Sequence, residues 1–255
     1  MDGKKDVSIE KLSPETGYID RSIYRKNISA AGKFSCRFKY KHTDIYIISD
    51  RDISGEIGEP VIKFYSQLEE VISSDKRFGE SLAPLTIKKD YPPAVKEMCL
   101  ASSIFGVGPM AAVAGAVCDS IAAGIKDECG FLMIENGGDV YIKSSQDIKA
   151  GLFTGSRHFP QNLNINISSK ALPCGLCSSS GIMGHSLSLG KSDLVTVMSE
   201  TAAAADAAAT AIANTISSKT DVDRAVEKYK KYGQIRGLII MKDDRLAIWG
   251  DLQLD

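Results

Sequence analysis

The residues of this chain that are best suited to chemistry lie close together, between Cys174 and Ser186. The segment reads Cys174-Gly-Leu-Cys177-Ser-Ser-Ser-Gly-Ile-Met-Gly-His185-Ser186. Cysteine and histidine supply a nucleophile and a base, and serine hydroxyls donate and accept hydrogen bonds. Glycines let backbone amides approach a ligand closely. This composition is not typical of a core strand or of an amphipathic helix, so we predict that a reactive centre lies here.

The pair Cys174 and Cys177 has several interpretations: half of a zinc site, a redox pair, a sulfur-handling pair or two buried structural thiols. No second Cys-x-x-Cys or His-x-x-x-His follows, which disfavours structural zinc. A thioredoxin-like motif opens a helix after a strand, whereas here Pro173 precedes the pair and serines follow it. His185 is either a base that tunes a thiolate or a core histidine bonded to the backbone.

A second candidate site lies on an alanine-rich segment that contains Asp206 and Thr210. Residues four apart project from one face of a helix. A carboxylate and a hydroxyl placed in this way could hold Mg²⁺, with water and a phosphate completing its shell. The alternative is a surface aspartate and a threonine bonded within the helix. Because alanines make up the rest of that face, we expect Asp206 to be buried and to need a partner.

Two glycine-rich turns are further candidates for ligand binding. One reads Glu135-Asn136-Gly137-Gly138-Asp139 and could approach a nucleotide or cofactor closely, or could be an ordinary hairpin turn. The other reads Gly106-Val-Gly108-Pro109 and leads into a predicted helix, where anions are favoured. It matches neither the Walker motif nor the Rossmann glycine spacing.

Composition excludes several classes of function. The formal net charge is −1, with 31 basic and 32 acidic residues, so no overall charge attracts nucleic acid or an anionic membrane. The chain opens without an apolar leader and contains no run of 18 apolar residues, so no membrane span is expected. We therefore predict a cytoplasmic protein whose six cysteines are reduced.

Hydrophobic periodicity predicts strands and helices in blocks, which is typical of an α+β fold with antiparallel sheets. We expect residues 1–16 to be a flexible N-terminus and 17–255 to form one domain of two pseudo-repeated halves, about 17–145 and 146–255. Each half contains strands, an alanine-rich helix and a closing hairpin. The predicted hairpins are 33–50, 130–143 and 235–249; the helices are 57–74, 92–103, 110–125, 200–217 and 220–232; the other strands are 148–155, 162–168, 184–189 and 193–198.

Over roughly residues 90–250 the chain resembles the ApbE superfamily, the relatives of the flavin transferases. Asn136-Gly-Gly-Asp139-Val resembles the glycine–aspartate turn of that superfamily, and Ser179-Ser180-Gly181 resembles its Ser-Gly segment. Asp206-x-x-x-Thr210 resembles its metal-binding helix. The resemblance implies a duplicated T-fold and ligand-binding roles for the matching residues. Together with the second glycine turn, the candidate ligand-binding set is Gly106, Gly108, Asn136, Gly137, Gly138, Asp139, Ser179, Ser180 and Gly181.

The chain is still more similar to an uncharacterised ApbE-related branch of archaea and anaerobic bacteria. The segments that carry this resemblance are Gly106-Val-Gly-Pro-Met-Ala-Ala-Val-Ala-Gly-Ala116, Cys177-Ser-Ser-Ser-Gly-Ile-Met-Gly-His-Ser186 and Ala204-Ala-Asp-Ala-Ala-Ala-Thr-Ala-Ile-Ala-Asn214. For this branch the resemblance implies a role in assimilating sulfide sulfur into homocysteine. The implied partners are an aspartate-semialdehyde sulfurtransferase and a ferredoxin-like protein.

Two departures separate the chain from the flavin transferases. Those enzymes carry a Lys-Gly pair followed shortly by Val-Asp, whereas this chain has Ala114-Gly115-Ala-Val-Cys118-Asp119 without the lysine. It also lacks their His-x-x-x-Asp-Pro-x-x-Gly stretch, where His185-Ser-Leu-Ser-Leu-Gly190 stands instead. These differences argue against flavinylation of a protein threonine. They leave room for the fold and for a divalent metal position.

We therefore predict a sulfur-assimilation protein in which Cys177 carries persulfide sulfur. Cys174 or Cys118 relays it, and His185 tunes the thiolate. The alternative is Mg²⁺-dependent chemistry on a flavin, a nucleotide or another phosphate-bearing ligand, with Asp206 and Thr210 as metal ligands and Asp139 nearby. A non-catalytic ligand-binding subunit is the third possibility. Small-residue helices and hairpins favour a homodimer.

Overall fold

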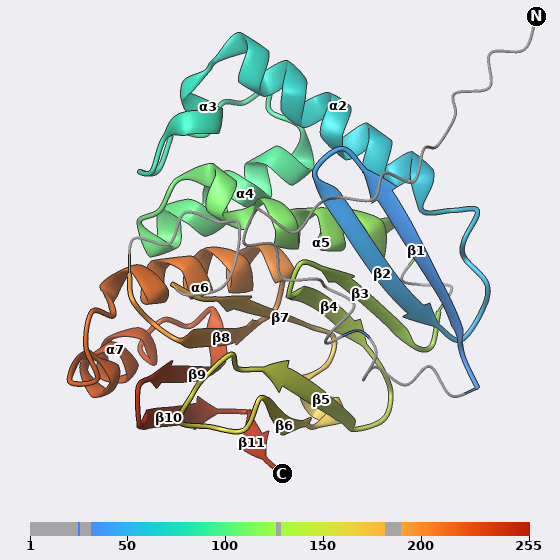
Figure 1. Ribbon diagram of the computed structural model, residues 1–255. Helices are drawn as coiled ribbons and strands as arrows, with labels where there is room; N and C mark the ends of the chain where they lie inside the picture. Colours follow the sequence, from blue (N-terminus) through green and yellow to red (C-terminus); the bar gives the residue numbers. More distant parts are fainter. Residues whose placement is uncertain (1–24, 26–31, 126–128, 182–189) are drawn as a thin grey trace, which may run out of the picture.

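Eight antiparallel strands form one continuous sheet in the order β1-β2-β3-β4-β7-β8-β9-β10 (Figure 1). The computed structural model describes residue 25 and residues 32–125, 129–181 and 190–255. The strands of this sheet are β1 (Phe34–Tyr40), β2 (Thr43–Ser49), β3 (Leu132–Asn136), β4 (Asp139–Lys143), β7 (Cys174–Ser179), β8 (Leu194–Ser199), β9 (Ile235–Lys242) and β10 (Arg245–Gly250).

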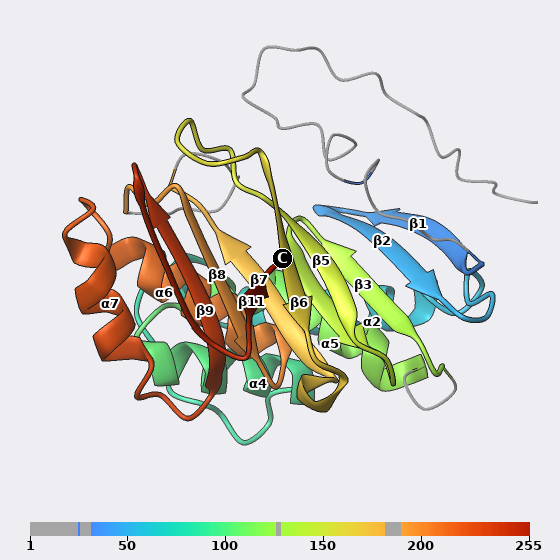
Figure 2. The same cartoon turned by 90° about the horizontal axis from the view of Figure 1, so that it is seen from below.

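Helices cover one face of this sheet, and a smaller sheet covers part of the other (Figures 1 and 2). The smaller sheet has the order β11-β6-β5. Two apolar cores result, one under the helices and one between the two sheets. The remaining elements are α2 (Gly58–Ser74), α3 (Arg77–Glu80), α4 (Pro93–Phe105), η1 (Pro109–Ala112), α5 (Val113–Ile125), α6 (Ala202–Thr215), α7 (Asp221–Tyr229), β5 (Ile148–Phe153), β6 (Asn162–Ile167), η3 (Ser169–Ala171) and β11 (Gln253–Leu254).

The predicted α+β architecture is confirmed, and each half of the large sheet has the same order of elements. β1 and β2 precede α2, α4 and α5, after which β3 and β4 close the first half. β7 and β8 precede α6 and α7, after which β9 and β10 close the second half. β4 pairs with β7, so the two halves meet at the centre of the sheet.

The prediction that the Cys174–Ser179 segment is unlike a core strand is wrong. It forms β7, which lies at the middle of the large sheet between β4 and β8. Its small side chains have a steric reason, because α6 lies directly on it. A Cβ atom added to Gly175 would lie 2.4 Å from the backbone of Ala202, closer than real contacts allow. The predicted strand 184–189 falls outside the described residues.

The two alanine-rich helices pack against each other as closely as α6 packs on β7. A Cβ atom on Gly115 of α5 would lie 2.2 Å from the carbonyl oxygen of Ala202. Apolar side chains of α5 and α6 lie in the core under the helices. This close approach fixes where the polar residues of the two helices lie relative to the sheet.

No single helix of the described residues is both long enough and apolar enough to span a bilayer. Among the described helices, one pair, Pro93–Phe105 and Pro109–Ile125, passes this test when its two parts are taken together, and these parts are bent by 105° at the break.

Candidate functional site

Asp139 begins β4 on the helix-covered face of the large sheet, and one of its oxygens has no partner among the described residues. The pairing of Val140 with Leu176 brings Asp139 beside Cys177. The Ser178 backbone N–H and the neighbouring Cys177 thiol both favour the charged form of this carboxyl group. Its Oδ1 is buried, and no hydrogen-bond partner for it is found in the described part of the chain. An unsatisfied buried oxygen is costly, so it is a natural position for a ligand.

Asp206 reaches the same region from α6. Its Oδ2 accepts a hydrogen bond from the Gly115 backbone N–H at 3.0 Å, at the start of α5. Asp206 is half-buried among buried alanines, as is Thr210 one turn later. The sequence analysis expected a buried Asp206 with a partner. The structure supplies one, the N-terminus of α5, where a carboxylate is favoured by the helix dipole.

The two carboxyl groups interact electrostatically. Burial, and then the negative charge of Asp206, raise the pKa of Asp139 well above its usual range. Burial also raises the pKa of Asp206 to about 7, and the Gly115 and Ala114 backbone N–H groups act against this rise. Carboxyl groups that repel each other in this way are stabilised by a proton or by a bound cation. The arrangement can therefore take up either one.

Asn136 ties the glycine turn to α5 rather than pointing freely toward a ligand. Thr43 Oγ1 donates to Asn136 Oδ1 at 2.7 Å, and Asn136 Nδ2 donates to the Ala114 carbonyl at 3.3 Å. Gly137 and Gly138 have φ angles of 73° and 103°, which favour glycine. The segment is a tight hairpin turn that also holds Asp139 beneath the start of α5.

Ser179 places a second unsatisfied oxygen on the helix-covered face. Alternation along β7 puts Ser179 on the same face as Cys177. Its hydroxyl oxygen is buried and, within the described ranges, has no hydrogen-bond partner. Ser180 is half-buried, and the Gly181 backbone N–H donates to the Ser192 carbonyl at 2.9 Å. Of these three residues, Ser179 has the side chain best placed to meet a ligand beside Asp139.

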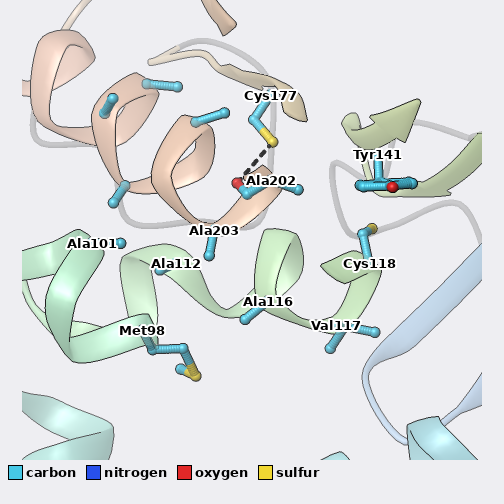
Figure 3. Packing of buried hydrophobic residues seen from close by; sticks show 14 of the residues in the cluster. Met98, Ala101, Ala112, Ala116, Val117, Cys118, Tyr141, Cys177, Ala202 and Ala203 are labelled. Atoms are coloured by element: carbon cyan, nitrogen blue, oxygen red, sulfur yellow. Dashed lines mark hydrogen bonds between the residues drawn. The ribbon is translucent and has the colours of Figure 1, made fainter. Parts of the chain in front are cut away.

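Cys118 and Cys177 come together at Asp139 from α5 and β7. The Cys118 thiol lies 3.6 Å from the Asp139 carbonyl, and the Cys177 thiol donates to the Ala202 carbonyl at 3.3 Å (Figure 3). Both side chains are 0% exposed. Burial, followed by the charge of Asp139, raises the pKa of each thiol well above its usual value. Both are therefore protonated at neutral pH.

Cys174 does not join them, which removes the direct relay that the sequence suggested. Side chains three residues apart on a strand point to opposite faces. Cys174 accordingly packs in the core between the two sheets, whereas Cys177 packs under the helices. Burial raises the pKa of Cys174 to about 12. His185 lies outside the described residues.

The Gly106–Pro109 turn is built for packing, contrary to the predicted phosphate cradle. Gly106 ends α4 with a left-handed φ of 75°, and the backbone N–H groups of Gly106 and Val107 both donate to the Ser102 carbonyl. A Cβ atom on Gly108 would lie 1.7 Å from the Ser81 carbonyl oxygen. The chain itself therefore occupies the space next to Gly108, and Gly106 serves the left-handed end of α4.

The set of site residues predicted from the sequence leaves out four residues that hold this region together: Arg25, Thr43, Asp119 and Glu135. Asp119 accepts hydrogen bonds from the Ala202 and Ala203 backbone N–H groups at 3.0 and 2.9 Å. Glu135 Oε1 accepts one from the Gly138 N–H at 2.9 Å. Acidic residues next to candidate residues, at 118–119 and 135–136, were the available signal. Nothing local in the sequence indicates Arg25 or Thr43.

Comparison with known proteins identifies the family. The family model described as AbpE bacteria matches residues 26–231, which is most of the chain. The chain belongs to this ApbE-like family. Its relatives include a UPF0280 protein of Methanothrix thermoacetophila, 37% identical over 75% of this chain and 81% of the relative. Another UPF0280 protein, from Archaeoglobus fulgidus, is 33% identical over 85% of this chain and 91% of the relative. The predicted ApbE-related archaeal branch is confirmed.

Solved structures of ApbE proteins share the fold. The flavin transferase ApbE from Vibrio cholerae aligns with a TM-score of 0.58 and 11% identity, over 85% of this chain and 96% of that structure. The ApbE protein from Thermotoga maritima aligns with a TM-score of 0.55 and 13% identity, over 86% of this chain and 97% of that structure. At these identities the similarity establishes an ApbE-like fold.

Proposed function

We propose that this ApbE-like protein binds a divalent cation such as Mg²⁺ at Asp139 and Asp206, together with a phosphate-bearing ligand of the nucleotide or flavin class. The observation that carries the proposal is the buried Asp139 Oδ1, which has no hydrogen-bond partner in the described part of the chain. The negative charge of Asp206 also raises the pKa of this carboxyl group. A cation would satisfy that oxygen and remove the repulsion between the two carboxylates.

The donor set fits a hard cation. Asp139, Asp206 and Thr210 offer oxygen atoms, which Mg²⁺ prefers, and Mg²⁺ usually keeps few protein ligands. Within the described ranges, no group of three or more His, Cys, Asp or Glu side chains gathers around one point. Water and phosphate oxygens complete the shell of a Mg²⁺ ion held in this way.

In this proposal each residue of the chain has a defined task. Asp139 supplies the buried oxygen, and the Gly115 backbone N–H holds the Asp206 carboxylate in place at 3.0 Å. Ser179 offers a hydroxyl to an oxygen of the ligand. A bound Mg²⁺ would neutralise phosphate charge. The flavin transferases that share the fold make a flavin nucleotide the first ligand to test.

The test is binding of flavin adenine dinucleotide and of ADP by titration calorimetry, with Mg²⁺ and with chelator. We expect Mg²⁺-dependent binding that Asp139→Asn weakens by at least ~100-fold, the upper end of the loss that even outer-shell partners of a metal cause. Asp119→Asn is the matched control, because Asp119 also caps a helix, through the Ala202 and Ala203 backbone N–H groups, but is not one of the proposed metal ligands. Its charge acts on Asp206, so we expect a change in affinity that is far smaller than that of Asp139→Asn. Binding that ignores chelator, or that Asp139→Asn leaves unchanged, would contradict the proposal.

A sulfur-carrier role is a second candidate, favoured by the convergence of Cys118 and Cys177 on Asp139. In such a step the Cys177 thiolate attacks the outer sulfur of a donor persulfide, the donor thiolate leaves, and a Cys177 persulfide forms. Cys118 replaces Cys174 as the neighbouring thiol. Since both thiols are buried and protonated, sulfur uptake requires that a partner expose Cys177. The predicted sulfurtransferase and ferredoxin-like partners would serve that role.

Intact-protein mass spectrometry after treatment with a persulfide donor and the partner proteins tests this second candidate. A gain of about 32 Da that disappears in Cys177→Ser is the expected result for a persulfide. Cys174→Ser is the control that should keep the gain, because Cys174 faces the other core. No gain in the wild-type protein, or a gain that survives Cys177→Ser, would exclude Cys177 as the carrier.

A further inference from the structure

Arg25 lies far from the candidate site in sequence and close to it in space. Its Nε donates to Glu135 Oε2 at 2.6 Å, and its guanidinium also donates to the Asp44 carboxylate at 3.0 Å and to the Asp44 carbonyl at 2.6 Å. The side chains of Arg25 and Glu135 are 8% and 4% exposed. The guanidinium carbon also lies 5.7 Å from the centre of the Tyr46 ring. These charge-assisted bonds fix the arginine firmly.

Glu135 connects this arginine to the glycine turn. One carboxylate oxygen accepts from Arg25, and the other accepts from the Gly138 backbone N–H at 2.9 Å. Glu135 is the last residue but one of β3, and Asp139, the first residue of β4, directly follows Gly138. A Gly-Gly turn has little conformational preference of its own, so an external bond is needed to select one geometry. The Glu135 carboxylate supplies that bond.

We propose that Arg25 is a positioning residue of the Asp139 site, acting through Glu135 on the Gly137–Gly138 turn. The proposal rests on the cation-binding function proposed above. Without Arg25, the buried Glu135 carboxylate would lose this charge-assisted partner and would be driven to move toward water. The turn would then lose its anchor, and Asp139 would lose its fixed place under α5.

The sign of the effect separates positioning from simple electrostatics. Removing a positive charge near a cation site should strengthen cation binding through space. Removing a positioning contact should weaken it, by ~10-fold for an outer-shell residue. Arg25→Gln therefore gives opposite outcomes under the two explanations.

Arg37 provides a matched control. It also hydrogen-bonds to Asp44, through Nε at 2.7 Å, but its side chain is 50% exposed. Burial alone would raise the pKa of Asp44, but hydrogen bonds from Arg37 and Arg25 hold it well below its usual range. Arg37→Gln thus removes an arginine from Asp44 and leaves the Glu135 bridge in place.

The experiment measures two quantities in the full chain: exchange of the Gly138 amide by NMR, and Mn²⁺ affinity by titration calorimetry. In Arg25→Gln we expect Gly138 exchange to accelerate by at least ~10-fold and Mn²⁺ affinity to fall by ~10-fold. Arg37→Gln should change neither. If Arg25→Gln does not fold, Arg25→Lys, which keeps a charge but not the forked geometry, should show the same changes in smaller size.

The two measurements test the positioning role and the cation site separately. Unchanged Gly138 exchange in Arg25→Gln, an equal change in Arg37→Gln, or tighter Mn²⁺ binding in Arg25→Gln would overturn the positioning role. Absence of Mn²⁺ binding by the wild-type protein would overturn the proposed cation site, while the exchange measurement would still decide whether Arg25 anchors the turn.

Discussion

The N-termini of α5 and α6 are filled in the same way, by a carboxylate from the other helix. Asp119 of α5 accepts from the first amides of α6, and Asp206 of α6 accepts from Gly115 near the start of α5. Gly115 lies four positions before Asp119, and Ala202 lies four positions before Asp206. The two helices are therefore joined by a reciprocal pair of caps, one from each half of the fold.

The surroundings of the two caps differ. At the start of α6, Ala202 is fully buried over Gly175 and its carbonyl accepts the Cys177 thiol. At the start of α5, Ala114 is half-buried, and the capping Asp206 is half-buried near the unsatisfied Asp139. At one end the cap lies over closely packed backbone. At the other it stands beside groups that can take a ligand.

The largest predicted effect comes from a substitution that disrupts the close contact between α5 and α6. Gly115→Ala should lower the free energy of unfolding by about 3 kcal/mol or more, because its Cβ would lie 2.2 Å from the Ala202 carbonyl oxygen. Gly124→Ala on the same helix is the control: it is exposed, with no atom within 4 Å of the added Cβ. It should gain roughly 0.5–1 kcal/mol from helix propensity. Urea unfolding measures both, and equal effects would refute the contact.

The second prediction concerns the Asp206 end and pH. In the folded protein Asp206 keeps its proton up to a pH of about 7, whereas its ordinary pKa is 3.8. Between these values the folded state binds more protons, so the free energy of unfolding should fall as pH rises from about 4 to about 7. Because Asp206 is partly exposed, solvent screening reduces the effect, and we expect a fall of roughly 2 kcal/mol.

Asp206→Asn should flatten this fall, because asparagine still accepts from Gly115 but does not titrate. Urea unfolding at pH 5 and pH 8, without divalent cations, compares the two proteins. A wild-type protein that is more stable at pH 8 would contradict the assignment of a raised pKa to Asp206.

The smallest effect sharpens the comparison between the caps. Asp119→Ala removes two capping hydrogen bonds and should cost about 1–2 kcal/mol of stability. If this end serves packing alone, Mg²⁺-dependent ligand affinity should stay within about twofold of the wild-type value, well below the loss typical of a metal-site residue. Thermal unfolding measures the stability, and calorimetry on the same preparation measures the affinity. A loss of affinity well above twofold would show that the Asp119 cap also contributes to ligand binding.

Local patterns in the sequence determined most elements of this protein. Periodicity located the alanine-rich helices and the hairpins, since each depends on residues a few positions apart. The Asp206 and Thr210 spacing on one helical face and the Gly137–Gly138 turn were likewise readable. The prediction for segment 174–179 was wrong because its small residues are needed for the close packing of α6, a helix from a later part of the chain.

The tertiary structure alone decided which of these residues meet. The strand at 174–179 sends Cys174 and Cys177 into different cores, while Cys118, from another part of the chain, arrives at Asp139. Arg25 reaches Glu135 across 110 positions, and Asp206 reaches Gly115 across 91. Contacts of this kind depend on how sheet and helices pack, and short-range propensity carries no information about them.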